Sequence, residues 1–139
     1  MTVLPSTLRP FPALEQLVDS ELARLSSSLS VSNFRSGAQL CREGDEGDHC
    51  FFLVDGRVIV SQAVSEARRV QLAELGPGTV FGLDALVPNQ HRSADVRASS
   101  NVQVLTLRRL EHQWALTQGA RWAVLLQEMC CKNLIGQLR

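Results

Sequence analysis

The stretch Cys50-Phe-Phe-Leu-Val-Asp-Gly-Arg-Val-Ile-Val60 contains two short apolar runs on either side of the dipeptide Asp55-Gly56. An Asp-Gly pair between aromatic and β-branched residues is a strong local signal for a β-hairpin, because both turn residues tolerate a positive φ. The sequence therefore predicts two antiparallel strands joined at Asp55-Gly56.

Short apolar runs separated by turn residues continue on both sides of this stretch. Turn signals recur about every eight to twelve residues, a spacing that is typical of small antiparallel sandwiches and barrels. The predicted strands are 38–41, 50–54, 57–60, 70–75, 79–81, 94–98 and 102–107.

Helical periodicity is confined to the two ends of the chain. Apolar residues fall at helical spacing over 13–26, and further helices are expected over 110–117 and 121–138. Residues 1–12, with three prolines, are expected to be an N-terminal extension that precedes a single domain over 13–139. This order predicts an α+β domain with helices gathered at one end of an antiparallel β-barrel.

Composition excludes several classes of protein. A chain of 139 residues that is 45% hydrophobic can bury a core without disulfides or a metal. Its 14 basic and 14 acidic residues cancel, which argues against nucleic-acid binding through bulk electrostatics. No apolar run approaches the roughly 20 residues of a membrane helix, and the N-terminus lacks the pattern of a signal peptide. A cytoplasmic protein that does not contact a membrane is expected.

The residues that most often carry catalysis or metals form no recognisable site. The four cysteines lack a Cys-x-x-Cys spacing and are expected to be buried thiols. The acidic run 43–48 does not fit a calcium-binding loop, and the three histidines form no closely spaced pair. Neither metal ligands nor catalytic residues are therefore assigned, and a barrel metalloenzyme is disfavoured. The sequence predicts a protein that is not an enzyme.

Residues 76–96 form the most unusual segment, in which a strand, a glycine, a short helix-like patch and Arg92 follow one another. Gly82 allows the backbone to approach a ligand, and the N–H groups after it favour an anion. An arginine reaching back over the turn would add a charge-assisted clamp on a phosphate. The pattern indicates a small anion pocket, although a surface turn followed by an arginine would look the same.

Four motifs of this chain occur together. They are Gly37-x-x-Leu40-x-x-Glu43-Gly44-Asp45-x-Gly47-Asp48, Phe51-Phe52-Leu53-Val54-Asp55-Gly56-x-Val58, Leu75-x-x-Gly78-x-x-Phe81-Gly82, and Arg92-Ser93-Ala94. Together they resemble the cyclic-nucleotide-binding domain family, which includes the sensor domains of cAMP-receptor-protein and FNR-type bacterial transcription regulators, kinase regulatory subunits and gated channels. The resemblance covers about residues 13–135.

The resemblance carries expectations of fold and assembly. It implies an eight-stranded antiparallel jelly-roll barrel with a phosphate-binding cassette over Phe81–Ala94. It also implies a C-terminal helix that covers the pocket and pairs with a second subunit, so a homodimer through residues 121–138 is expected. No cofactor is required, and cAMP or cGMP is the expected ligand.

The resemblance also assigns ligand-binding residues. Gly82, the N–H groups of Asp84 and Ala85, Arg92 and Ser93 match the positions that bind the cyclic phosphate.

Leu83 lies at a sixth ligand-binding position but departs from the family pattern, which has a glutamate there to accept a hydrogen bond from the ribose 2′-hydroxyl. Burying that hydroxyl without a partner costs about 1–3 kcal/mol. Asp84 is no simple substitute, because adjacent residues of a helical turn point about 100° apart.

Two functions follow from these residues. One is a regulatory sensor domain that binds a cyclic nucleotide or a related phosphate-bearing ligand at the cassette. The other is a ligand-independent dimerisation or interaction module of the same fold, in which Asp84 turns inward, pairs with Arg92 and fills the anion site. The direction of the Asp84 side chain separates them.

Overall fold

Strand β3 (His49–Asp55) contains the two phenylalanines of the decisive stretch, and four of its consecutive residues are buried. In the computed structural model, which describes the backbone of residues 2–137 and the side chains of residues 2–132, both faces of this strand are covered. Phe51 and Leu53 belong to the core between two sheets, whereas Cys50 and Phe52 pack beneath helices. Because successive strand residues point to opposite faces, burial on both sides explains the uninterrupted apolar run.

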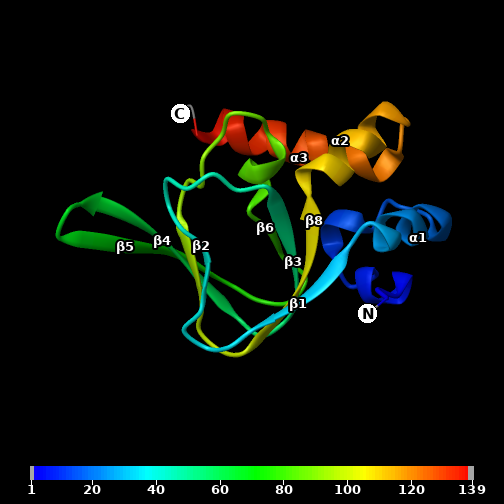
Figure 1. The fold of residues 1–139 in the computed structure, drawn as a ribbon. Helices are drawn as coiled ribbons and strands as arrows, with labels where there is room; N and C mark the ends of the chain where they lie inside the picture. The colour runs from blue at the N-terminus through cyan, green and yellow to red at the C-terminus, as the bar shows by residue number, and fades with distance from the viewer. Residues whose placement is uncertain (1, 138–139) are drawn as a thin grey trace.

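Two four-stranded antiparallel sheets pack as a jelly roll (Figure 1). One sheet has the order β1-β8-β3-β6 and the other the order β2-β7-β4-β5. The α+β class is confirmed, but the sheets form a sandwich and do not close into a barrel. The remaining strands are β1 (Ser30–Phe34), β2 (Gln39–Cys41), β4 (Val58–Ser65), β5 (Arg68–Leu75), β6 (Val80–Phe81), β7 (Asp95–Ala98) and β8 (Val102–Arg108).

Strand β1 is missing from the sequence prediction because its residues are mostly polar. It lies at the edge of its sheet and pairs only with β8. Within it, Val31 and Phe34 pack against the core, while Ser30 and Asn33 are exposed. An edge strand is paired with a neighbour on one side only, so fewer of its side chains need to be apolar and its sequence signal is weak.

The Asp55-Gly56 turn connects the two sheets, so the hairpin predicted there is wrong. Strand β3 pairs with β6 and β8, whereas β4 pairs with β5 and β7. Gly56 has φ +87°, and a Cβ at this position would overlap the carbonyl oxygen of Asn101. The glycine is therefore required by the close approach of the β7–β8 connection. The actual hairpin is β4–β5, which projects from the body of the sandwich (Figure 1).

The predicted helix over 13–26 is divided into a 3₁₀ turn, η2 (Pro12–Leu14), and helix α1 (Asp19–Ser27). Val18 separates them because its backbone is extended, with φ −76° and ψ 165°, and Arg9 donates from Nη1 to the carbonyl oxygen of Leu17 at 3.0 Å beside this break. Helices α2 (Arg109–Thr117) and α3 (Arg121–Gln137) lie close to their predicted ranges. Position 138 of the predicted last helix lies outside the described residues.

Helix α3 packs over the short helix η3 (Leu83–Leu86) and also contacts α1 and α2. The three C-terminal and cassette helices thus lie together at one end of the sandwich (Figure 1). Over the residues that the structure describes, no helix has the length and apolar character needed to cross a membrane.

The N-terminal segment contributes to the core, although the sequence predicts an extension over residues 1–12. It begins with a 3₁₀ turn, η1 (Pro5–Leu8), and Val3, Leu8 and Phe11 are buried. The Phe11 ring meets Phe52 edge to face, with ring centroids 5.7 Å apart. The segment therefore covers part of the outer face of β3.

We expect Phe11→Ala to lower the free energy of unfolding by about 3–5 kcal/mol, because it leaves a cavity against Phe52. Chemical denaturation measures this change. Leu4→Ala is the matched control, since Leu4 is 62% exposed, and should change the stability by less than about 0.5 kcal/mol. Equal, small effects of both substitutions would mean that the N-terminal segment does not fold with the sandwich.

Candidate functional site

The chain turns sharply between β6 and η3, at Gly82. This residue has φ +73°, and a Cβ on it would lie 2.8 Å from Nη1 of Arg92. Any other residue would meet both backbone strain and the guanidinium group. Glycine therefore brings the backbone of the turn directly against Arg92.

Arg92 lies just before β7 and is buried, with 6% of its surface exposed. Its Nη1 donates to the carbonyl oxygen of Gly82 at 2.9 Å, and its Nη2 to that of His49 at 2.8 Å. Its Cζ lies 5.7 Å from the centroid of the Phe51 ring. On the other side a Cβ at Gly47 would overlap the guanidinium group. The cation is thus held between two glycines by backbone carbonyls.

The Asp84 side chain turns inward and binds the donors beside it. Its Oδ1 accepts a hydrogen bond from Arg92 Nη1 at 3.1 Å, and its Oδ2 accepts one from the Ser93 backbone N–H at 3.0 Å. Ser93 Oγ lies 3.3 Å from the same Oδ2. The side chains of Arg92 and Asp84 are 5% and 14% exposed, so the ion pair is largely shielded from water.

The other cassette residues also have partners within the protein. The Ala85 N–H donates to the carbonyl oxygen of Gly82 at 3.2 Å. Leu83 is buried in the core cluster that includes Trp122 and Leu126 of α3. The residue that departs from the family pattern therefore packs against α3, which covers the cassette and is called the lid helix below.

A thiol joins the lid helix to the cassette backbone. Cys130 of α3 donates from Sγ to the carbonyl oxygen of Leu83 at 3.5 Å. Burial raises the pKa of the Cys130 thiol to about 11, so it is protonated and remains a donor at neutral pH.

The cavity beside this ion pair is small, with a volume of about 100 Å³. Pockets that hold small organic ligands usually measure about 300–1,000 Å³. Burial raises the pKa of the Cys41 thiol in its wall to about 11, and the nearby Arg92 partly opposes the effect. The lining residues are Cys41, Val60, Phe81, Gly82, Asp84, Arg92, Ser93, Ala94 and Val96.

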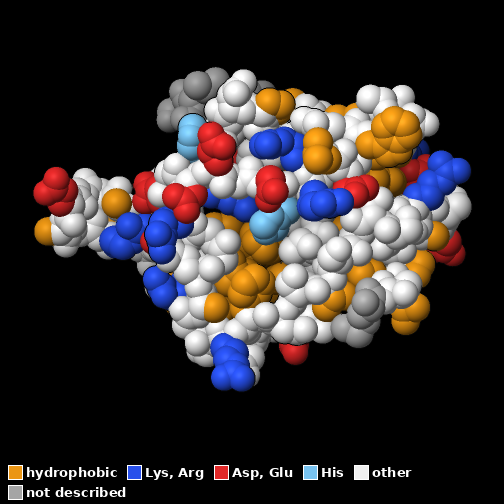
Figure 2. Space-filling model, viewed as in Figure 1, with side chains coloured by type: hydrophobic (Ala, Val, Ile, Leu, Met, Phe, Trp, Pro, Cys, Tyr) orange, Lys and Arg blue, Asp and Glu red, His pale blue; other side chains and the backbone are white. Residues whose placement is uncertain are grey.

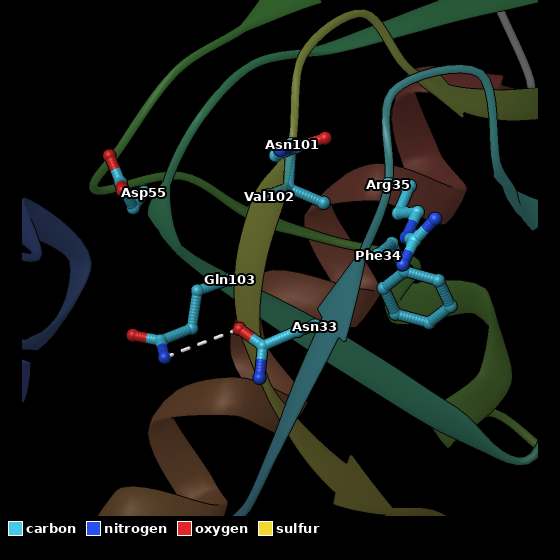
Figure 3. A pocket seen from close by; sticks show the side chains of 7 residues that line it. All are labelled: Asn33, Phe34, Arg35, Asp55, Asn101, Val102 and Gln103. Atoms are coloured by element: carbon cyan, nitrogen blue, oxygen red, sulfur yellow. Dashed lines mark hydrogen bonds between the residues drawn. The ribbon is translucent and has the colours of Figure 1, made fainter.

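A larger and more open hollow of about 440 Å³ lies elsewhere on the sandwich, near the edge strand β1 (Figure 3). Its wall is mostly exposed and polar, and Gln103 Nε2 donates to Asn33 Oδ1 at 3.4 Å within it. It shares no lining residue with the Arg92 cavity. The residues drawn around it are Asn33, Phe34, Arg35, Asp55, Asn101, Val102 and Gln103.

The structure brings together all six residues proposed from the sequence: Gly82, Leu83, Asp84, Ala85, Arg92 and Ser93. Four lie at the cavity, whereas Leu83 and Ala85 are buried behind it. The sequence reasoning missed Gly47 and the carbonyl of His49, which hold Arg92 in place. Gly47 stands in the acidic-turn motif, but only the folded chain shows that it meets Arg92.

Within residues 2–132, no group of three or more histidine, cysteine, aspartate or glutamate side chains is arranged to hold a metal ion. Three of the four cysteines are buried, but Cys131 is exposed, so the expectation of four buried thiols is wrong for this residue. It lies on the outward side of α3.

The fold is an eight-stranded jelly roll. A short helix follows β6, and a buried arginine precedes β7. The family described as "Cyclic nucleotide-binding domain" matches residues 31–118. The chain therefore belongs to the cyclic nucleotide-binding domain family.

Relatives of this chain occur in channels and kinases. A cyclic nucleotide-gated potassium channel of Mesorhizobium japonicum is 34% identical over 117 residues, which cover 84% of this chain and 31% of the channel. Human cGMP-dependent protein kinase 2 is 34% identical over 95 residues, which cover 68% of this chain and 12% of the kinase. The chain thus spans less than a third of either relative.

Solved structures show the same fold. The N-terminal domain of a transcriptional regulator from Streptomyces coelicolor superposes with a TM-score of 0.78 at 27% identity, covering 94% of this chain and 92% of that one. A cyclic nucleotide-binding domain from Methylobacillus flagellatus gives a TM-score of 0.83 at 17% identity, covering 99% of this chain and 83% of that one.

We expect Arg92→Ala to lower the free energy of unfolding by about 3–5 kcal/mol, because it leaves the Asp84 carboxylate buried without its cation. The double variant Arg92→Ala/Asp84→Ala should regain part of this loss. Urea denaturation of the single and double variants measures the coupling.

The control is Arg57→Ala, which breaks an ion pair with Glu74 whose side chains are 53% and 44% exposed. An exposed pair of this kind contributes at most about 1 kcal/mol. If Arg92→Ala were no more destabilising than Arg57→Ala, the buried pair would not support the fold.

Proposed function

We propose that this domain is a regulatory module of the cyclic-nucleotide-binding type in which the Asp84 carboxylate takes the place of a ligand phosphate. In this function the cassette and its lid helix pack together without a nucleotide. The module is not an enzyme and acts through its interactions with other protein surfaces.

The observation that carries the proposal is the set of donors bound by Asp84. Its two oxygens bind Arg92 Nη1, the Ser93 N–H and Ser93 Oγ. The family resemblance assigns Arg92 and Ser93 to the cyclic phosphate. An internal anion on these donors removes the need for an external one.

Electrostatics and space both oppose a bound nucleotide in this arrangement. A phosphate about 4 Å from the Asp84 carboxylate would meet a repulsion of about 4 kcal/mol at an effective dielectric constant near 20. The cavity of about 100 Å³ is smaller than ligand pockets usually are. Leu83 also offers no side-chain acceptor for a ribose hydroxyl.

The second candidate function is a sensor in which cAMP, cGMP or a related phosphate-bearing ligand displaces Asp84 from Arg92. It is favoured by the positions of Gly82 and the buried Arg92 cation in the wall of the cavity, where both would face a ligand once Asp84 had turned away. The names of the relatives support the same ligand class, since they include a cyclic nucleotide-gated channel and a cGMP-dependent kinase.

For the surroundings of the domain we propose a cytoplasmic location and no direct contact with nucleic acid or membrane. Its net charge of zero supports the absence of contact with nucleic acid. Figure 2 shows cationic and anionic side chains interspersed on the face in view, without a broad patch of one sign. Nucleic-acid binding usually needs a concentrated positive surface. A role as the sensor domain of a transcription regulator is one setting that the Streptomyces likeness supports.

Isothermal titration calorimetry separates the two candidates. We expect the wild-type protein to give no measurable binding of cAMP, cGMP or cyclic dinucleotides at micromolar concentrations. Asp84→Asn removes the internal charge and should strengthen the binding of cAMP or inorganic phosphate by up to about 1,000-fold, which is the repulsion of about 4 kcal/mol expressed as a ratio of affinities.

Asp95→Asn is the matched control for this titration. Asp95 pairs with Arg69 at 3.1 Å, so the substitution also neutralises an aspartate in an ion pair, but Asp95 neither pairs with Arg92 nor lines the Arg92 cavity. It should leave binding unchanged. Micromolar binding of a cyclic nucleotide to the wild-type protein would instead establish the sensor.

We also propose that the domain forms a homodimer through residues 121–138, by means of the face of helix α3 that does not pack against the domain's own core. Trp122, Leu126 and Cys130 are buried in the domain's own core and are not free to pair. Val124 and Cys131 are exposed and lie seven residues apart, on the same face of the helix. The side chains of 133–138 lie outside those that the structure describes.

Mild oxidation with copper phenanthroline tests this dimer. If two α3 helices pair in parallel, the Cα atoms of the two Cys131 residues would come within the separation of about 4.4–6.8 Å that a disulfide needs. We expect a covalent dimer on a non-reducing gel for the wild-type and Cys130→Ser proteins, and none for Cys131→Ser. The dimer would be contradicted if analytical ultracentrifugation showed a monomer at about 100 times the protein concentration used for the oxidation.

A further inference from the structure

His112 is a fully buried histidine at the contact between helices α2 and α3. It has no exposed surface, and its ring lies 6.4 Å from that of Trp122. Its Nε2 is 3.0 Å from the backbone carbonyl oxygen of Ala123, in the first turn of α3. One imidazole ring therefore joins the two C-terminal helices.

The partner of Nε2 fixes the protonation of the ring. A carbonyl oxygen can only accept a hydrogen bond, so Nε2 carries the proton in the neutral side chain. The other nitrogen, Nδ1, is then an unprotonated acceptor. It is buried and finds no hydrogen-bond partner among the described residues. The neutral ring makes one bond to α3, and a second proton would have no acceptor to receive it.

Burial dominates the acid–base behaviour of this ring. It lowers the pKa of His112 from 6.5, and the hydrogen bond to Ala123, which acts in the opposite direction, is the weaker influence. Within the described side chains, no charged group on the surrounding elements contributes to this shift. The imidazolium ion would be a buried cation without a counter-ion.

The charged residues of β8, α2, α3 and η3 are all exposed or engaged elsewhere. They are Arg108 and Glu111, which pair with each other; Arg109, which donates to Gly47 and Ala85; Asp84, which binds Arg92; and Arg121, Glu128 and Lys132, which are exposed.

We propose that His112 is a proton-sensitive latch, which holds α3 against α2 when neutral and releases α3 when protonated. Protonation places an uncompensated charge in the contact between the helices, and separation of the helices allows water to solvate it. The latch is a property of this helix pair and does not depend on whether the cassette binds a ligand.

Release of α3 would reach the Arg92 site because the helix also covers the cassette. Cys130 of α3 is hydrogen-bonded to the Leu83 carbonyl, and Leu126 is buried in the same cluster as Leu83. The connection between the helices contains Gly119, which has φ +70° and open space within 4 Å of the point where a Cβ would lie. This exposed turn provides a hinge at which α3 can move while α2 stays on the sandwich.

The direction of the pH effect follows from the lowered pKa. The open state binds a proton near pH 6.5, while the closed state binds one only at lower pH. The closed state is therefore fully favoured above pH 6.5 and loses stability as the pH falls below it. Opening should become about tenfold more frequent for each pH unit, down to the pKa of the closed state.

Hydrogen exchange measured by mass spectrometry between pH 7.5 and 5.0, corrected for intrinsic exchange rates, tests the latch. Peptides from residues 121–132 should lose protection as the pH falls, whereas β3 should keep its protection. His112→Gln retains an N–H donor for Ala123 but cannot be protonated, so it should make the protection of α3 independent of pH. His91→Gln, at an exposed histidine, should behave as the wild type.

Proton NMR titration of the wild type gives a measurement that does not depend on the variant folding. The His112 resonance, assigned by comparison with His49→Gln and His91→Gln, should titrate below pH 6.5. The proposal would be overturned if the His112 resonance titrated at or above pH 6.5. It would also be overturned if the hydrogen-exchange protection of α3 did not change with pH, or if a folded His112→Gln variant kept the wild-type pH response.

Discussion

The burial of one positive charge, the Arg92 guanidinium, organises the end of the sandwich where the cassette lies. A buried cation needs partners, and this one has the carbonyl oxygens of Gly82 and His49 together with the Asp84 carboxylate. These partners belong to the cassette turn, strand β3 and helix η3. The ion therefore joins segments that are far apart in the sequence and fixes the shape of the turn.

The same turn is coupled to the C-terminal helices through the opposite face of η3. Leu83 is buried with residues of α3, and the Leu83 carbonyl accepts a hydrogen bond from Cys130. Asp84, the next residue, points toward Arg92. A single short helix thus presents an anion to the cation on one side and an apolar surface to the lid on the other. The Asp84 carboxylate therefore binds Arg92 on the side of η3 that is opposite to the packing of Leu83 against α3.

Much of this arrangement can be predicted from local sequence, and the exceptions have physical causes. The cassette glycine and arginine are recognisable because backbone freedom and fixed charge are properties of the residue itself. The pairing of β3 was mispredicted because an Asp-Gly turn specifies a sharp change of direction and not which strands pair. Strand β1 was missed because an edge strand can be polar. Gly47 was missed as a neighbour of Arg92 because nothing local to it indicates contact across 45 residues.

The sequence by itself determined the family and the α+β class, and it predicted six residues that the structure brings together around Arg92. Only the tertiary structure decided that Asp84 turns inward, that residues 3–11 complete the core beside Phe52, and that His112 is buried between two helices. The reason is physical. Propensity, glycine and charge act within a few residues of the chain, whereas the direction of a side chain and the partners of a buried charge depend on segments that folding brings together.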